Sequence, residues 1–139
     1  MKNGKTSFKS KIGWHFDNTY SRLPEAMLSR LLPVPVKSPK LVILNYSLAK
    51  ELGLDFSKIS NEELSFIFSG NSLPHGSEAI AQAYAGHQFG HFTMLGDGRA
   101  IIIGEHLTQN KKRFDIQFKG SGETPVSYTH LTLPTTPYV

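Results

Sequence analysis

The clearest chemistry in the sequence lies in a glycine-rich turn at residues 96–99. Gly96 and Gly98 flank Asp97, and Arg99 follows directly. Glycine backbones leave their N–H groups open to a ligand, and a guanidinium binds phosphate oxygens through two parallel hydrogen bonds. The turn therefore predicts an anion site. Because Asp-Gly is also a common turn before a strand, these four residues alone leave a turn without chemistry open.

Lys119 strengthens the anion interpretation. In RFDIQFK, residues 113–119, apolar and polar side chains alternate, which predicts a half-buried strand with Lys119 on its polar face. The Gly120-Ser121-Gly122 segment that follows leaves space beside the lysine. A glycine turn, a strand, a hairpin and a strand lysine resemble the phosphate-binding half of a protein kinase. The alternative is a lysine that is solvated on an exposed strand.

The sequence argues against other kinds of site. His87 and His91 have the spacing of metal ligands on a helix, but Gly86 and Gly90 make a continuous helix there improbable. Gln88 stands where a zinc protease would have its glutamate, so packing and hydrogen-bonding roles are favoured for these histidines. The absence of cysteine excludes disulfides and thiolate sites. A dinucleotide fingerprint is excluded because no glycine or helix follows the turn at the required place.

Composition is that of a single globular domain with a mild positive charge. The 139 residues carry a formal net charge of +4, and 39% are hydrophobic. The basic residues are scattered rather than arranged in a stripe, so we expect an anionic small ligand and no nucleic acid. No apolar run follows the N-terminal lysines, so we expect a cytoplasmic protein without a secretory signal or membrane contact.

The elements that must position these residues suggest an α+β fold. Periodicity and capping residues predict helices at 24–32, 45–53, 61–70 and 77–84, with Asn45 and Asn61 as caps. The three prolines of residues 33–40 predict an extended connector, and residues 1–23 an irregular arm. Strands are expected at 100–105 and 113–119, joined by a hairpin loop.

Two long motifs, YAGHQFGHFTMLGDGRAIIIGE and DIQFKGSGETP, closely resemble the selenoprotein O family, also called the YdiU family in bacteria. The segments FDNTYSRLPE, LVILNYSLAKELGLD and FSGN agree with its N-terminal region. The resemblance covers roughly residues 14–125. It implies a protein-kinase-like fold that binds ATP in a flipped orientation and transfers AMP to serine, threonine or tyrosine hydroxyls of proteins, with Mg²⁺ or Mn²⁺.

The resemblance also implies site residues. Gly96, Gly98, Arg99 and Lys119 match ATP-binding positions, whereas the catalytic aspartate and the metal ligands are expected further along than this chain extends. No catalytic or metal-binding residue is therefore expected in it, and the chain alone is expected to be inactive. A protein kinase that transfers the γ-phosphate, and a non-enzymatic module that binds a nucleotide or a partner, are the competing functions.

The sequence after Thr124-Pro125 departs from the family pattern. The family continues with a second Gly-Asp-Gly-Arg turn, whereas residues 126–139 are uncharged apart from the C-terminus and rich in threonine. We therefore expect residues 1–125 to be the N-terminal region of a kinase-like nucleotide-binding domain. Residues 126–139 are expected to be a foreign read-through. Such a truncated lobe is expected to leave an apolar face uncovered and to be poorly stable alone.

Overall fold

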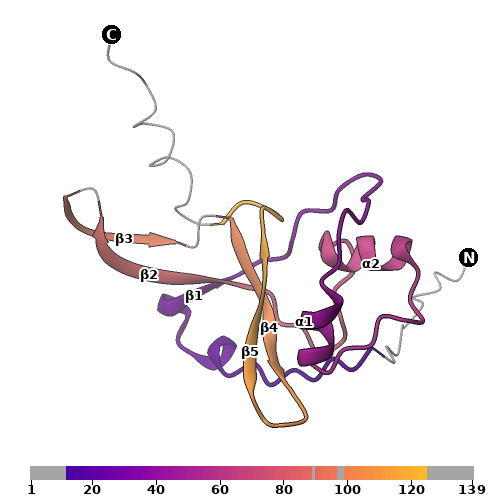
Figure 1. The fold of residues 1–139 in the computed structure, drawn as a ribbon. Coiled ribbons are helices and arrows are strands. Elements are labelled where there is room, and N and C mark those ends of the chain that lie inside the picture. Colours follow the sequence, from indigo (N-terminus) through magenta and orange to yellow (C-terminus); the bar gives the residue numbers. More distant parts are fainter. Residues whose placement is uncertain (1–11, 89, 97–98, 125–139) are drawn as a thin grey trace, which may run out of the picture.

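The computed structural model describes residues 12–88, 90–96 and 99–124, with the backbone alone at 84–88 and 91–96 (Figure 1). Short helices and an antiparallel sheet confirm the α+β class. The elements are the 3-10 turns Tyr20–Arg22 and Glu25–Met27, the helices α1 (Tyr46–Glu51) and α2 (Asn61–Phe68), and the strands β1 (Leu28–Arg30), β2 (Ile80–Gln88), β3 (His91–Gly96), β4 (Ala100–Leu107) and β5 (Arg113–Lys119). The kinase-like part of the expectation stays a proposal, and the boundary expected at 125/126 lies outside the described residues.

The sheet has the order β1-β2-β4-β5, with β3 paired to β2. The beginning of β2 is central, because Ile80 pairs with Arg30 of β1 and with Ile102 of β4. The rest of β2 extends beyond that sheet and forms a hairpin with β3 (Figure 1). Residues 97–99 then connect β3 to β4, so the glycine turn joins the hairpin to the main sheet.

The two predicted helices at 45–53 and 61–70 are confirmed. The Asn45 side chain accepts a hydrogen bond from the Leu48 N–H at 3.0 Å and caps α1. At α2 the cap is Ser60 rather than Asn61, because Ser60 and Glu63 form a reciprocal capping box. No helix within the described part of the chain is long and apolar enough to cross a membrane.

The helices predicted at 24–32 and 77–84 are wrong. Residues 24–32 form a single 3-10 turn and then β1, and most of the second segment belongs to β2. Both segments have good helix formers, but each is short, and isolated helices of that length are marginal. Pairing Leu28 with Gln82 and burying Ile80 and Ala81 makes the sheet the more favourable arrangement. The extended connector at 33–40 has no helix or strand, as predicted.

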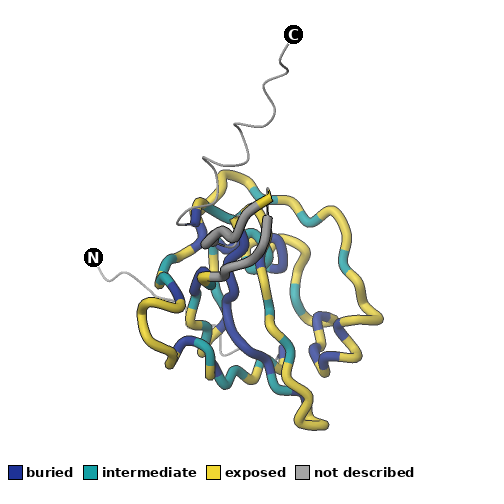
Figure 2. Tube along the Cα trace, turned by 90° about the vertical axis from the view of Figure 1, so that its left-hand side faces the viewer, coloured by how far each residue is buried: buried dark blue, intermediate teal, exposed yellow. Residues whose placement is uncertain are grey.

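Helices α1 and α2 cover one face of the β4–β5 hairpin. Leu52 and Leu64 belong to a buried cluster that includes Phe114 and Ile116 of β5 at its margin. On the other face of β4, Ile102 packs with Leu28 of β1 and Ile80 of β2, which belong to the same sheet. Figure 2 shows buried residues running through the centre of the molecule while most loops are exposed. Strand β4 is therefore buried on both faces.

A β-bulge interrupts the pairing of β4 with β5. Ile102 pairs with Gln117, but Gly104 pairs with Ile116, so β4 has one extra residue between these two pairs. Such a bulge reverses the alternation of side chains beyond it. Which residues of β4 point to a given side of the sheet therefore changes between even and odd positions at the bulge.

The bulge puts Glu105 on the same face as Lys119. Ala100 pairs with Lys119, and Glu105 pairs with Asp115. Cross-strand partners project to the same side, and alternate residues of β5 share one side, so all four share a face. Without the bulge, Gly104 would occupy this face, and the Glu105 carboxylate would point toward α1.

Candidate functional site

The structure brings two predicted site residues together at one end of the β4–β5 hairpin. Lys119 ends β5 opposite Ala100, and the Gly120 N–H donates to the Arg99 carbonyl at 2.9 Å. Both charged residues are exposed, with Lys119 on the polar face of β5, as predicted. Gly96 ends β3 just before the turn, whereas Gly98 lies outside the described residues. Two cationic residues thus lie at the same end of the hairpin, Arg99 directly before β4 and Lys119 at the end of β5.

The backbone around Arg99 has an unusual conformation. Its φ of +60° is in the left-handed region that non-glycine residues rarely adopt. The Arg99 N–H donates to Thr124 Oγ1 at 3.2 Å, and Gly120 also has a positive φ of +78°. Segment 120–124 therefore folds back against the turn. Hydrogen bonds of the Arg99 backbone to Gly120 and Thr124 thus hold Arg99 against segment 120–124.

An extended segment supports segment 120–124 from behind. We call residues 31–44, between β1 and α1, the strap. The Val34 N–H donates to the Ser121 carbonyl at 2.7 Å, and a Cβ at Gly122 would lie 3.2 Å from Val34 Cγ2. On its other side the strap is held by Asn71, which accepts from the Val36 N–H at 2.9 Å and donates to the Val36 carbonyl at 2.8 Å. The strap therefore links the end of α2 to the candidate site.

Replacing Asn71 by alanine should loosen the strap. Two exposed hydrogen bonds are lost, so we expect a destabilisation of about 1 kcal/mol and faster amide exchange at Val36 and Val34. Hydrogen–deuterium exchange and urea denaturation measure both effects. Asn110→Ala, in the β4–β5 loop, is the matched control. Unchanged exchange at Val36 in Asn71→Ala would show that Asn71 does not hold the strap.

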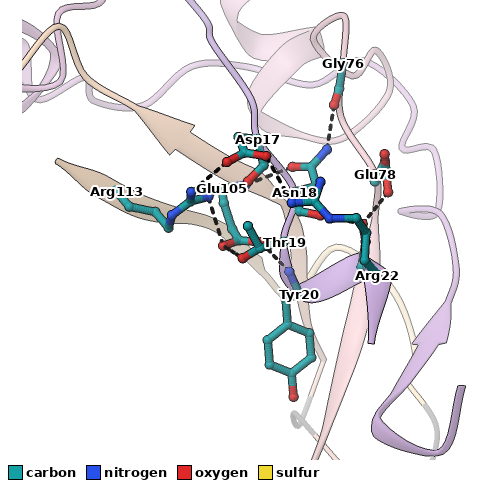
Figure 3. Close-up of polar contacts among 10 residues, drawn as sticks. Asp17, Asn18, Thr19, Tyr20, Arg22, Gly76, Glu78, Glu105 and Arg113 are labelled. Carbon is teal, nitrogen blue, oxygen red and sulfur yellow. Dashed lines mark hydrogen bonds and ion pairs between the residues drawn. The ribbon is translucent and has the colours of Figure 1, made fainter. Parts of the chain in front are cut away.

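A buried acidic group lies further along β4, on the same face as Lys119 (Figure 3). Glu105 accepts hydrogen bonds from Thr19 Oγ1 and the Tyr20 N–H, each at 2.6 Å, and from Arg113 Nη1 at 3.2 Å. Its side chain is only 7% exposed. Burial alone would raise the pKa of Glu105, but these hydrogen bonds and the Arg113 charge outweigh it and hold that pKa below its usual value.

Asp17 and Asn18 complete this cluster. Arg113 Nη2 and Asp17 Oδ2 form an ion pair at 2.7 Å, and hydrogen bonds from Arg113 and then Arg22 lower the pKa of Asp17. Asn18 accepts from the Glu105 N–H at 3.0 Å and donates to the Gly76 carbonyl at 2.8 Å. These contacts tie the arm before β1 to β4. We assign the cluster a structural role, because its charged and polar groups form hydrogen bonds and ion pairs with one another.

A histidine for which no role was predicted, His106, packs in the core. It is buried, its Nδ1 accepts from the His15 N–H at 3.1 Å, and its Nε2 lies 2.8 Å from the Leu52 carbonyl. Because a carbonyl can only accept, Nε2 donates to the Leu52 carbonyl, while Nδ1 accepts from the His15 N–H. His87 and His91 lie in β2 and β3 and not in a helix. Within the described ranges, no group of three acidic or histidine side chains could hold a metal ion.

Sequence reasoning proposed Arg99 and Lys119 as site residues, a prediction that stays open, and it missed the Glu105 cluster. FDNTYSR contributed only to the family resemblance, and Glu105 looked like part of a buried strand. The one available signal was a glutamate at the end of an otherwise apolar run, since a buried carboxylate needs donors. Its donors, Thr19 and Tyr20, are more than eighty positions away in the sequence.

Comparisons with known proteins match one family over most of the chain. The sequence model of the family described as protein adenylyltransferase SelO matches residues 11–130. A relative in Pelagibacter ubique, named protein nucleotidyltransferase YdiU, is 68% identical over 116 residues, which are 84% of this chain and 24% of that protein. Relatives of the same name in Nitrosococcus oceani and Bacillus cytotoxicus are 67% and 57% identical over 82% and 88% of this chain, and 23% and 25% of their own lengths. The chain thus spans about a quarter of the length of these relatives.

Proposed function

The chain belongs to the protein adenylyltransferase SelO family, and we propose that it forms the ATP-binding N-terminal part of a protein adenylyltransferase. The observation that carries this proposal is that Arg99, directly before β4, and Lys119, at the end of β5, lie at the same end of the hairpin, beside two glycine-containing segments. This arrangement places two cationic residues at one end of the hairpin, and a triphosphate requires such cations. The protein-kinase-like fold is part of the same proposal.

In the proposed site each residue has a distinct role. Gly96 and Gly98 provide backbone donors, and Arg99 binds phosphate oxygens through its planar guanidinium. Lys119 provides a compact positive charge from the end of a strand, where its backbone is held by pairing with Ala100. No other group is needed to explain why a nucleotide would bind at this end of the hairpin.

The proposed reaction is the transfer of AMP. A serine, threonine or tyrosine hydroxyl of a protein substrate attacks the α-phosphorus of ATP, the bond between the α- and β-phosphates breaks, and pyrophosphate leaves. Negative charge grows on the phosphate oxygens, and fixed cations stabilise that charge. Arg99 and Lys119 would supply such cations, and positioning the triphosphate would supply the rest of their contribution.

The described residues do not fit a metal site, because no cluster of acidic or histidine ligands is present among them. As the family resemblance implies, we propose that the Mg²⁺ or Mn²⁺ ligands and the catalytic aspartate lie in the part of the full-length protein that this chain does not span. The chain without that part is expected to bind ATP at most weakly and to transfer nothing.

Labelled ATP tests the proposal in a full-length chimera, in which residues 12–124 of this chain replace the matching part of the Pelagibacter ubique relative. We expect label from the α-phosphate, and not from the γ-phosphate, to be found on protein. Transfer of γ-label would instead show a protein kinase. Binding of ATP without transfer of either label would show a binding module. Either result would contradict the AMP-transfer proposal.

A further inference from the structure

The strap exposes an unusual amount of apolar surface. In the run Leu41-Val42-Ile43-Leu44, the two leucines pack against the core cluster of α1 and α2. The two residues between them point outward, with Val42 95% and Ile43 85% exposed. Four more exposed apolar side chains lie in the neighbouring sequence: Leu32, Val34 and Val36 of the strap, and Tyr46 at the start of α1. We call these four with Val42 and Ile43 the strap surface.

Exposure on this scale indicates an interface. A single exposed apolar residue is ordinary, but several from one segment are typical of a surface that is covered in the complete molecule. The strap is also firmly held, since Asn71 and Ser121 bind its backbone. Its side chains are therefore presented on a fixed backbone, which lowers the entropic cost of docking.

The path of the chain indicates what covers this surface. The described part ends at Thr124, just after Ser121 and Gly122 contact Val34 of the strap. Figure 1 shows the end of β5 and the residues after it next to the strap. The last described residues of the chain therefore lie beside Val34 of the strap surface. In the relatives about three quarters of the protein lies outside the matched part, so the rest of the protein is large enough to cover the strap surface.

We propose that the strap surface is the docking site for the part of the full-length protein that follows residue 124. The proposal rests on family membership and on the position of Thr124, and not on AMP transfer. Lys37 and Lys40 stand between the two apolar stretches and are exposed. Acidic side chains at the edge of the docked part would complement them, with the apolar residues at the centre of the interface.

Cysteine labelling in the full-length chimera tests this proposal. The chain has no cysteine of its own, so Val42→Cys and Lys111→Cys each introduce one known site within it. Lys111 lies in the exposed β4–β5 loop and serves as the control position. Alkylation by a small maleimide is followed by mass spectrometry of the peptides. We expect the cysteine at 42 to react more than about tenfold more slowly than the one at 111, at every protein concentration.

Two results would overturn the proposal. Equal rates at 42 and 111 would show that the strap surface is open in the full-length chimera. Slow labelling at 42 only at concentrations where light scattering reports a dimer would show that a second copy covers it. If Val42→Cys does not fold, Tyr46→Cys gives the same comparison. Label transfer from ATP is scored separately, so failure of the docking proposal and failure of the AMP-transfer proposal are distinguishable.

Discussion

In the full-length chimera, Lys119→Ala is expected to lower the kcat/KM for AMP transfer by about 100-fold or more, because a fixed charge on the triphosphate is lost. The backbone at this position is held from both sides. Residue 119 pairs with Ala100, and the Gly120 N–H donates to the Arg99 carbonyl. The side chain is exposed, so its removal leaves the fold intact. Rates measured with α-labelled ATP give the effect.

Two further variants separate charge from shape at Lys119. Lys119→Arg keeps the charge but changes its shape and reach, so partial activity is expected. Lys112→Ala removes a lysine from the other end of the same hairpin and should leave kcat/KM unchanged. Full activity in Lys119→Ala, with an unchanged melting temperature, would show that Lys119 is not part of the nucleotide site. The proposal of a nucleotide site would then depend on the glycine turn.

The parts of the fold that sequence reasoning predicted are those set by neighbouring residues. The alternation in RFDIQFK predicted β5 with Lys119 on its polar face, and the Asn45 cap predicted α1. Both signals lie within a few residues of the element they describe. The two strands and the loop between them were also predicted, and the pairing of this hairpin brings Ala100, next to Arg99, opposite Lys119.

The parts that were missed depend on contacts between distant segments. Strand β2 has the alanine-rich composition of a helix, but Ile80 lies between β1 and β4, and later residues pair with β3. Local propensity is a weak guide where such pairing is available. The bulge between Ile102 and Gly104 was equally hidden, because the apolar run around it has no alternation to reveal a change of face.

This bulge has a consequence for the Glu105 cluster. Gly104 approaches the arm closely, since a Cβ there would lie 2.8 Å from Asn18 Oδ1. The same Asn18 oxygen accepts the Glu105 N–H, and the Glu105 carboxylate binds Thr19. Gly104 therefore lets the arm approach β4, and the bulge turns Glu105 toward it. One end of the β4–β5 hairpin is tied to the arm, and its other end presents Lys119.

Glu105→Gln is expected to destabilise the 139-residue chain by about 2 kcal/mol at neutral pH, since hydrogen bonds to a buried charge are lost. Much of the loss comes from the donors Thr19 and Tyr20, because Arg113 is 37% exposed and its ion pair contributes little. Urea denaturation followed by fluorescence of Trp14, which is the only tryptophan and contacts His106, measures it. Glu51→Gln, an exposed glutamate of α1, is the matched control.

The same variant tests the direction of the pKa shift. The pKa of Glu105 in the folded chain lies below its usual value of 4.5, so its carboxylate stabilises the fold above that pH. As the pH falls through the lower pKa of the folded state, the carboxylate is protonated and the stabilisation is lost. The difference between the wild-type chain and Glu105→Gln should therefore be constant from neutral pH to about pH 5.5, and shrink toward about pH 3. A difference that stays the same over this whole range would show that Glu105 contributes through packing and not through its charge.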